Sequence, residues 1–569
     1  HYLAKELILE MIDSPESLTY LGVVDRFNWL TNHQSKISIT GLSDMEEDLA
    51  DAKKLKALLL SYKNESLSEQ QKITKEIAVF DASNFIKETE EFPFHNYPLN
   101  QIGGIHLNAV EFMTDVHPIR NVKEAEAYID RLNLFDDSFE ATLEILNAQK
   151  KAGIFPPKFV FDHLIRQLEE FLNFKENENP LRSVFLRKIE DLNLASEVSS
   201  DLISKLDNSI ENSVTPGFKL LYDFVKETRK KANQYHGVWS LPNGDEFYAL
   251  RLKVYTTTDY SAEDIHNIGL SEVERITKHM QEIAFDLGYG DQVKVGQLMN
   301  SLNEDSNFLY SDTPDRKERV VADYNSIVEE TWNISELYFH NMPKSRVEVR
   351  AVPEYSEQNQ AGGYYMHPAL DGSRPGVFYA NLYDIKQTPT YSMRTLAFHE
   401  AIPGHHLQVA LNLENESLSL YRRFGYGTSA FSEGWALYAE RLALEAGLAE
   451  DPYDELGVLQ SELFRAVRLV VDTGIHYKRW SREEAMAYMK NVTGMSDTEV
   501  RVEIERYIVW PGQACSYKVG MLKILELREK AKEKLGEDFN IKDFHSVILE
   551  QGQPPLFIVE DLVNLMLDN

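Results

Sequence analysis

The chain has 569 residues, of which 43% are hydrophobic and 26% charged, a composition typical of a large folded globular protein with two or more subdomains. Its formal net charge of −32 disfavours nucleic-acid partners, which require a basic surface that displaces counterions from phosphates. Cys515 is the only cysteine, so intrachain disulfides and cysteine-ligated zinc are excluded.

Helical periodicity dominates residues 1–235, which we expect to form an N-terminal helical lobe. No apolar run reaches the ~18 to 20 residues of a membrane span, so no transmembrane segment is expected. The opening "HYLAKELILE" does not resemble a secretion signal. Because the chain does not begin with methionine, it is compatible with a processed protein whose targeting segment has been removed.

Residues 236–569 form the second predicted region, which carries the chemical motifs. At its start, "WSLPNGDEFYALRLKVYTT" joins a turn-forming Pro-Asn-Gly to a segment rich in Tyr, Leu, Val and Thr and predicts a short strand. Ser261 followed by Asp264 predicts the N-cap of a helix, and a further helix is expected over about 319–341.

Two or three strands are expected in the range from about 345 to 385. "SRVEVRAVP" alternates apolar and polar residues, and "SRPGVFYANLYD" contains a short β-prone run. Helical patterns resume at Thr390 and dominate to the end of the chain. The predicted fold is mainly α, with one small β-sheet beside the helix that carries the histidine motif.

That motif is "FHEAIPGHHLQ", residues 398–408. It begins like the H-E-x-x-H helix of zinc proteases, in which two histidines four residues apart bind the metal and the glutamate acts as base. His399 and Glu400 occupy the first two positions, but Pro403 stands where the second histidine is expected. Three histidines within eight residues, the first followed directly by glutamate, favour a Zn²⁺ site over ordinary histidines beside a helix kink.

The second ligand is His405 or His406. In an unbroken helix His405 points away from His399, whereas His406 shares its face but lies about 10 Å further along the axis. Pro403 lacks the N–H that would bond the carbonyl of His399, and Gly404 can adopt backbone angles that other residues avoid. We expect these two residues to form a bulge that brings His405 to the ligand position, with His406 as the alternative.

A carboxylate on a later helix is expected to complete the metal site. "AFSEGWALYAERL" supplies Glu433, 28 residues after His405, which is enough chain to end one helix and return along another. Glu433 is the expected third ligand. Glu440, seven residues further on, is expected to support the ligands through a hydrogen bond or to replace Glu433.

Four stretches carry a family resemblance: "FHEAIPGHHLQ", "FSEGWALYAE", "RLVVDTGIHYKRWSREEA" and "PGQACSYKVG". Together they resemble a bacterial family catalogued as domain of unknown function 885, many of whose members look like secreted or lipid-anchored envelope proteins. This resemblance implies the bacterial periplasm or cell envelope and a lipid anchor on a segment preceding the chain. The family in turn looks like a distant relative of the gluzincin metallopeptidases. "SEGWALYAE" resembles the aminopeptidase motif whose glutamate binds zinc, which supports Glu433, and Gly404-His405 resembles the end of the thimet-type zinc motif, which supports His405.

A zinc metallopeptidase acting on peptides or peptide-like substrates is therefore the expected function. Glu400 is the expected general base, and Tyr517 and His476, both in family-resembling stretches, are the candidate oxyanion donors. Asp472 precedes His476 by four residues and is expected to orient its ring.

The expected substrate-binding strand contains Phe378, Tyr379 and Ala380, because its position in the sequence resembles that of the strand beside the active-site helix in gluzincins. Two other functions stay open: a zinc hydrolase of a non-peptide amide or ester, and a noncatalytic metal-binding envelope protein.

Overall fold

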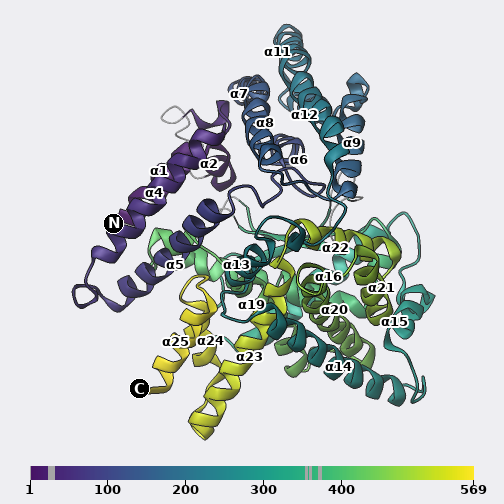
Figure 1. Cartoon of the computed structure of the whole chain (residues 1–569). Coiled ribbons are helices and arrows are strands. Elements are labelled where there is room, and N and C mark those ends of the chain that lie inside the picture. Colours follow the sequence, from purple (N-terminus) through teal and green to yellow (C-terminus); the bar gives the residue numbers. More distant parts are fainter. Residues whose placement is uncertain (1, 23–31, 353–356, 358–361, 369–373, 569) are drawn as a thin grey trace. The chain divides into compact units, whose positions relative to one another are not determined.

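The structure is a computed structural model that describes residues 2–22, 32–352, 357, 362–368 and 374–568 (Figure 1). The chain divides into two compact units, one comprising His1–Ser66 and Ala78–His236 and the other Leu67–Ile77 and Gly237–Asn569. The described residues form helices throughout and one three-stranded sheet, which confirms the mainly α fold with a small sheet. In these ranges, no helix combines the length and the apolar character that crossing a membrane requires.

Apart from two isolated β-bridges, the regular elements of the first unit are helices over its described residues. Its core includes the stacked rings of Phe135 and Phe139, and Asn121 caps one of its helices by accepting the backbone N–H of Glu124. Its helices are α1 (Tyr2–Asp13), α2 (Pro15–Leu21), α4 (Leu42–Ser61), most of α5 (Glu69–Glu91), α6 (Ile105–Glu111), α7 (Val122–Leu132), α8 (Phe135–Lys151), α9 (Lys158–Leu172), α10 (Pro180–Glu190), α11 (Ser196–Ser209) and α12 (Thr215–Thr228).

The second unit contains the sheet and the residues of the histidine motif. Its helices are α13 (Gly244–Thr256), α14 (Ala262–Asp286), α15 (Val295–Glu304), α16 (Arg316–Ser335), α17 (Thr390–Glu400), α18 (His405–Glu414), α19 (Ser429–Glu445), α20 (Pro452–His476), α21 (Arg482–Thr493), α22 (Asp497–Val509), α23 (Ser516–Leu535), α24 (Ile541–Leu549) and α25 (Leu556–Asp568).

Two expectations at the start of this unit have opposite outcomes. The helix start at Ser261 is confirmed, since its hydroxyl accepts the backbone N–H of Asp264 at 3.1 Å. The strand expected near residue 250 is wrong, because the segment forms α13. Asp245 and Glu246 lie in the first turn of α13, where the helix dipole favours negative charge, and burial of residues such as Phe247 overrides the β propensity of the Tyr, Val and Thr residues.

The sheet has the strand order β1-β3-β2. Its strands are β1 (Val347–Ala351), β2 (Gly363–Met366) and β3 (Gly376–Ala380). β3 is the central strand, parallel to β1 with Val347 opposite Gly376 and antiparallel to β2 with Gly363 opposite Ala380. Buried side chains of the sheet pack with those of α16 and α17 in one apolar cluster, which holds the metal-motif helix against the sheet.

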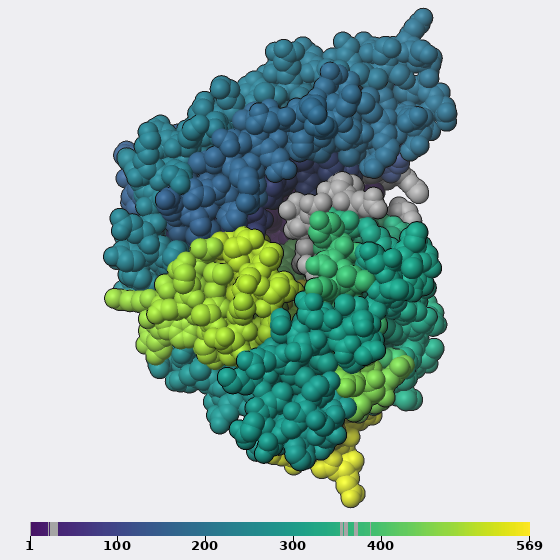
Figure 2. All heavy atoms as spheres, turned by 90° about the vertical axis from the view of Figure 1, so that its right-hand side faces the viewer, coloured from purple at the N-terminus to yellow at the C-terminus, as the bar shows by residue number. Residues whose placement is uncertain are grey.

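Helix α20 is the most deeply buried long helix around the site. Buried residues occur on all of its faces, and it packs against α14, α17, α21, α22 and α23. In Figure 2 the exposed faces of α14 and α15, coloured teal, and of α21 and α22, coloured yellow-green, form much of the visible surface of this unit. Side chains on α20 therefore mainly contact other helices of the same unit.

Candidate metal centre

The break in the histidine motif is a turn between two helices. α17 ends at Glu400 and α18 begins at His405, with Ala401 to Gly404 forming the turn. The backbone N–H of His406 donates to the carbonyl of Ala401 at 3.1 Å, five residues back, so the chain makes a wider turn than in an α-helix. The expected bulge is thus a complete interruption of the helix, and His405 is the first residue of α18.

Gly404 and Trp435 hold this turn in place. A Cβ atom on Gly404 would lie 1.9 Å from the carbonyl oxygen of His399, so only glycine fits this close approach of two backbone segments. The indole N–H of Trp435 on α19 donates to the carbonyl of Pro403 at 2.9 Å. The same helix carries Glu433, so this hydrogen bond links the turn to the third predicted ligand.

His399, His405 and Glu433 come together. One ligand atom from each of the three lies within 4.8 Å of the others. Nε2 of His399 and Nε2 of His405 each lie 3.4 Å from Oε2 of Glu433, and the two imidazole rings are 4.8 Å apart and nearly perpendicular. Among the described residues, this is the one cluster of three or more such side chains.

These separations fit a tetrahedral zinc site. Zinc bonds of ~2.1 Å to nitrogen and oxygen give an edge of ~3.4 Å between neighbouring ligands of a tetrahedron. Both imidazole-to-carboxylate separations have this value. Two neutral imidazoles and one carboxylate also form the donor set of catalytic zinc sites with one open position. The residues present therefore fit a zinc ion.

Glu440 lies behind His399. Its Oε1 is 2.7 Å from Nδ1 of His399, and both side chains are buried. A proton on Nδ1 donated to Glu440 leaves the lone pair of Nε2 directed at the ligand cluster. Burial lowers the pKa of His399, but the hydrogen bonds that its ring donates to Glu433 and Glu440, together with the charges of Glu440 and Glu400, outweigh it and raise this pKa to about 9. The site therefore has an excess of negative charge that favours a cation.

His406, the alternative ligand, faces away from the cluster. Its Nε2 donates to the carbonyl of Ser345 at 2.9 Å, and its Nδ1 accepts the hydroxyl of Tyr365 at 3.0 Å. A Cβ on Gly376, at the start of β3, would lie 2.5 Å from Nδ1. His406 thus ties α18 to the sheet, and the alternative is wrong because both ring nitrogens are used there.

The expectations for His476 and Asp472 are also wrong. His476 is fully buried, where its Nδ1 accepts the N–H of Val238 at 3.1 Å and its Nε2 donates to the carbonyl of Tyr507 at 3.0 Å. No ring N–H is left for an oxyanion. Asp472 accepts hydrogen bonds from Tyr248 at 2.6 Å and from the N–H of Gly512, so it does not orient His476.

Tyr517 lies in the first turn of α23, where this helix meets the first turns of α19. The hydroxyls of Ser516 and Ser429 are 2.7 Å apart, and a Cβ on Gly434 would lie 2.5 Å from the Cα of Gly520. Glu433 precedes Gly434, so the turns that carry Glu433 and Tyr517 are in direct contact. The Tyr517 side chain is half-buried there.

The predicted substrate strand is the wrong strand for edge pairing. β3, with Phe378, Tyr379 and Ala380, has a partner strand on each side, and Phe378 and Ala380 are fully buried. The strand beside α17 that has a partner on one side only, among the described residues, is β2. The run "GGYYM" carries the β-prone tyrosines that could have marked this strand in the sequence.

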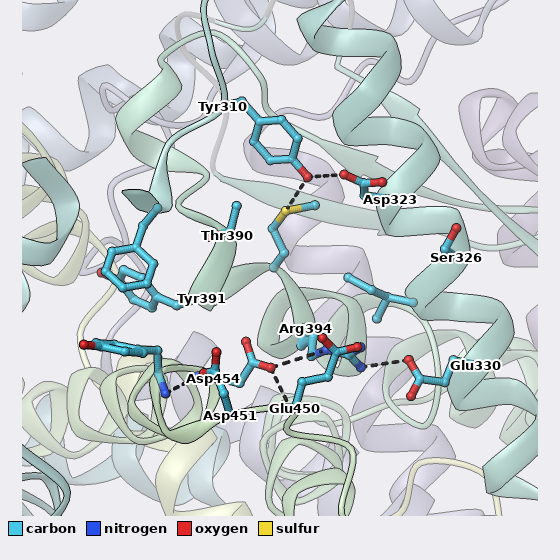
Figure 3. A pocket seen from close by; sticks show the side chains of 14 residues that line it. Tyr310, Asp323, Ser326, Glu330, Thr390, Tyr391, Arg394, Glu450, Asp451 and Asp454 are labelled. Carbon is cyan, nitrogen blue, oxygen red and sulfur yellow. Dashed lines mark hydrogen bonds and ion pairs between the residues drawn. The ribbon is translucent and has the colours of Figure 1, made fainter. Parts of the chain in front are cut away.

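Ion pairs of Arg394, near the middle of α17, anchor the helix that carries His399 and Glu400. Arg394 is buried and pairs with Glu330 on α16 at 2.9 Å, with Asp454 on α20 at 3.4 Å and with Glu450 (Figure 3). These side chains line a cavity of ≈ 450 Å³ that contains none of the three ligand residues. Sequence reasoning did not identify Arg394, since a single arginine in a helix has no motif.

The model of one protein family matches residues 15–563, and its description is "Bacterial protein of unknown function (DUF885)". The crystal structure of a "putative lipoprotein" from Colwellia psychrerythraea is 34% identical, covers 100% of this chain and 98% of its own, and has a TM-score of 0.95. A "putative lipoprotein of unknown function" from Shewanella oneidensis shares the fold at 19% identity and a TM-score of 0.75, with 99% of both chains covered. No curated protein matches the chain.

Proposed function

The chain belongs to the bacterial DUF885 family, and from the residues of its own site we propose that it is a zinc-dependent metallopeptidase. The observation that carries this proposal is the cluster of His399, His405 and Glu433, whose separations match a tetrahedral zinc site with one open position. A zinc ion held there would acidify a water molecule and polarise a carbonyl group.

Glu400 is the proposed general base. It follows His399 directly at the end of α17, and its charge raises the pKa of the His399 ring, so its carboxylate acts at the site. Glu400 does not belong to the cluster of His399, His405 and Glu433. Its carboxylate is therefore available to accept a proton from water and to return it to the leaving amine. A purely structural metal site has no need of such a base, which disfavours the noncatalytic alternative.

The proposed substrate is a peptide that pairs with the outer edge of β2. The carbonyl of Gly362 accepts the N–H of Asn381 in the sheet, and the antiparallel register then directs the backbone groups of Gly363 and Tyr365 outward. A Cβ on Gly363 would lie 3.2 Å from the side chain of Leu396, one turn before His399, so this edge adjoins the metal helix. An extended peptide can add to it as a further strand.

Two further parts of the proposal concern the oxyanion donor and the location of the protein. The hydroxyl of Tyr517 is the proposed oxyanion donor, because its turn contacts that of Glu433. The bacterial envelope is the proposed location, because two proteins with this fold are each described as a "putative lipoprotein". The relationship to gluzincins and the alternative of a non-peptide amide or ester substrate stay predictions.

Metal analysis of purified protein and cleavage of a peptide library test the proposal. We expect one zinc per chain and a loss of turnover of roughly 100- to 10,000-fold in Glu400→Gln, the contribution of a general base, with the zinc content unchanged. Glu416→Gln, an exposed change close by in the sequence, is the matched control. Bound zinc without any cleavage that depends on Glu400 would exclude a peptidase, and absence of stoichiometric metal would exclude the site.

A further inference from the structure

Arg468 on α20 is a buried arginine with one unused nitrogen. The residue is 5% exposed, and its Nη1 has no hydrogen-bond partner among the described residues. Its other nitrogens are used, because Nε donates to the hydroxyl of Tyr507 at 2.9 Å and Nη2 to Glu503 at 3.2 Å. A buried guanidinium nitrogen without an acceptor is costly, so Nη1 requires a partner that none of the described residues supplies.

The surroundings of Arg468 carry more positive than negative charge. Glu503 also accepts from Arg506 at 3.0 Å, so this one carboxylate serves two guanidinium groups. Asp472, which is close enough to be affected by Arg506, has its pKa raised to about 7 by burial and therefore supplies only part of a charge near neutral pH. An anion is the ligand that such a site lacks, although the chain as a whole is strongly acidic.

Arg468 also packs against Tyr517, whose helical turn contacts the turn that carries the predicted ligand Glu433. The carbon at the centre of its guanidinium lies 4.4 Å from the ring centroid of Tyr517 and 4.2 Å from that of Phe464. The turn that carries Tyr517 contacts the turn that carries Glu433. The ring of Tyr517 therefore links Arg468 to the turn that contacts the predicted ligand Glu433.

We infer that Arg468, through Nη1, binds the C-terminal carboxylate of a peptide substrate, so that the enzyme acts from the C-terminal end of that substrate. This inference rests on the proposed peptidase function and names its substrate class. The planar guanidinium, held by Tyr507, Glu503 and the two flanking rings, is preorganised to donate to a carboxylate. A peptide with a C-terminal amide lacks the negative charge that this site requires.

Two measurements test the inference. One compares kcat/KM for a peptide pool of mixed sequence prepared with a free C-terminal carboxylate and with a C-terminal amide. The other measures binding of the same two pools, labelled with fluorescein at the N-terminus, to the zinc-loaded Glu400→Gln variant by fluorescence anisotropy, which requires no turnover. In both we expect a preference of roughly 10- to 100-fold for the free acid, the effect of one charge-assisted hydrogen bond.

Arg468→Gln is expected to abolish this preference, and Arg468→Lys to retain part of it. The matched control is Arg528→Gln, because Arg528 is equally buried, lies over the ring of Tyr438, and has both terminal nitrogens paired with Glu445. This control should lower stability while leaving the preference for the acid unchanged.

The outcomes separate the two proposals. Equal cleavage and equal binding of acid and amide would overturn carboxylate recognition and leave the peptidase intact. Tighter binding of the acid that depends on Arg468, without any cleavage by the wild type, would support carboxylate recognition and overturn the peptidase. A preference for the acid that persists in Arg468→Gln would overturn the role of Arg468.

Discussion

Gly404→Ala tests whether the interrupted helix creates the metal site. The added Cβ would lie 1.9 Å from the carbonyl oxygen of His399 and 2.4 Å from that of Phe398. Restoring the 3.0 Å that such contacts require needs a shift of about 1.1 Å, from 1.9 Å to 3.0 Å, between the end of α17 and the start of α18. His399 and His405 lie on opposite sides of this contact, so the shift changes their separation.

A shift of this size exceeds what a zinc site tolerates. Ligand distances vary by only about 0.2 Å around their ideal values, so a displacement five times larger removes one imidazole from the ion. We expect Gly404→Ala to weaken zinc binding at least 100-fold, which corresponds to about 2.7 kcal/mol. The hydrogen bond from Trp435 to Pro403 and the packing of α17 on the sheet should keep the protein folded.

Competition with a chromophoric chelator measures the zinc affinity, and circular dichroism with thermal unfolding reports the fold. Gly362→Ala is the control, because a Cβ there meets no atom within 4 Å. Wild-type zinc affinity in a folded Gly404→Ala protein would refute the view that the close approach at Gly404 sets the ligand geometry.

Three further predictions concern the groups around the site. Glu440→Gln should weaken zinc binding roughly 10- to 100-fold by removing the carboxylate that orients His399, whereas Glu445→Gln on the same helix should not; equal affinities would contradict this role. Removing zinc with a chelator should lower the unfolding temperature, and zinc at a thousandfold excess over its Kd should restore about 4 kcal/mol in the wild type but not in His399→Ala, as followed by calorimetry. Burial raises the pKa of Asp472 to about 7 from ~3.9 in the unfolded chain, so the folded state binds the extra proton between these values. Stability should therefore fall as pH rises from about 4 to 7, by on the order of 4 kcal/mol, and urea unfolding of Asp472→Asn should lack this slope.

Local signals in the sequence were sufficient to predict the mainly α fold class and to select the three side chains that cluster in the structure. Apolar periodicity and the Ser261 cap act within a few residues, so they predict helices without knowledge of the fold. Pro403 removes one helical hydrogen bond and Gly404 permits backbone angles that other residues avoid, and this local break is why the sequence favoured His405 as the second ligand. Glu433 followed from its position early in a later helix.

Tertiary structure decided every question that depends on what packs against a side chain. By residue type, His406 could bind a metal and His476 could donate to an oxyanion. In the folded chain, however, their ring nitrogens donate to the carbonyls of Ser345 and Tyr507, which are far away in the sequence. The order of the strands made β3 central and placed β2 beside α17. Whether Nη1 of Arg468 has a hydrogen-bond partner likewise depends on how residues of three helices pack around it. The sequence alone determined which side chains can do the chemistry, because that depends on residue type and local spacing. Which of them are free to do it depends on hydrogen bonds and packing between distant segments, and these exist only in the folded chain.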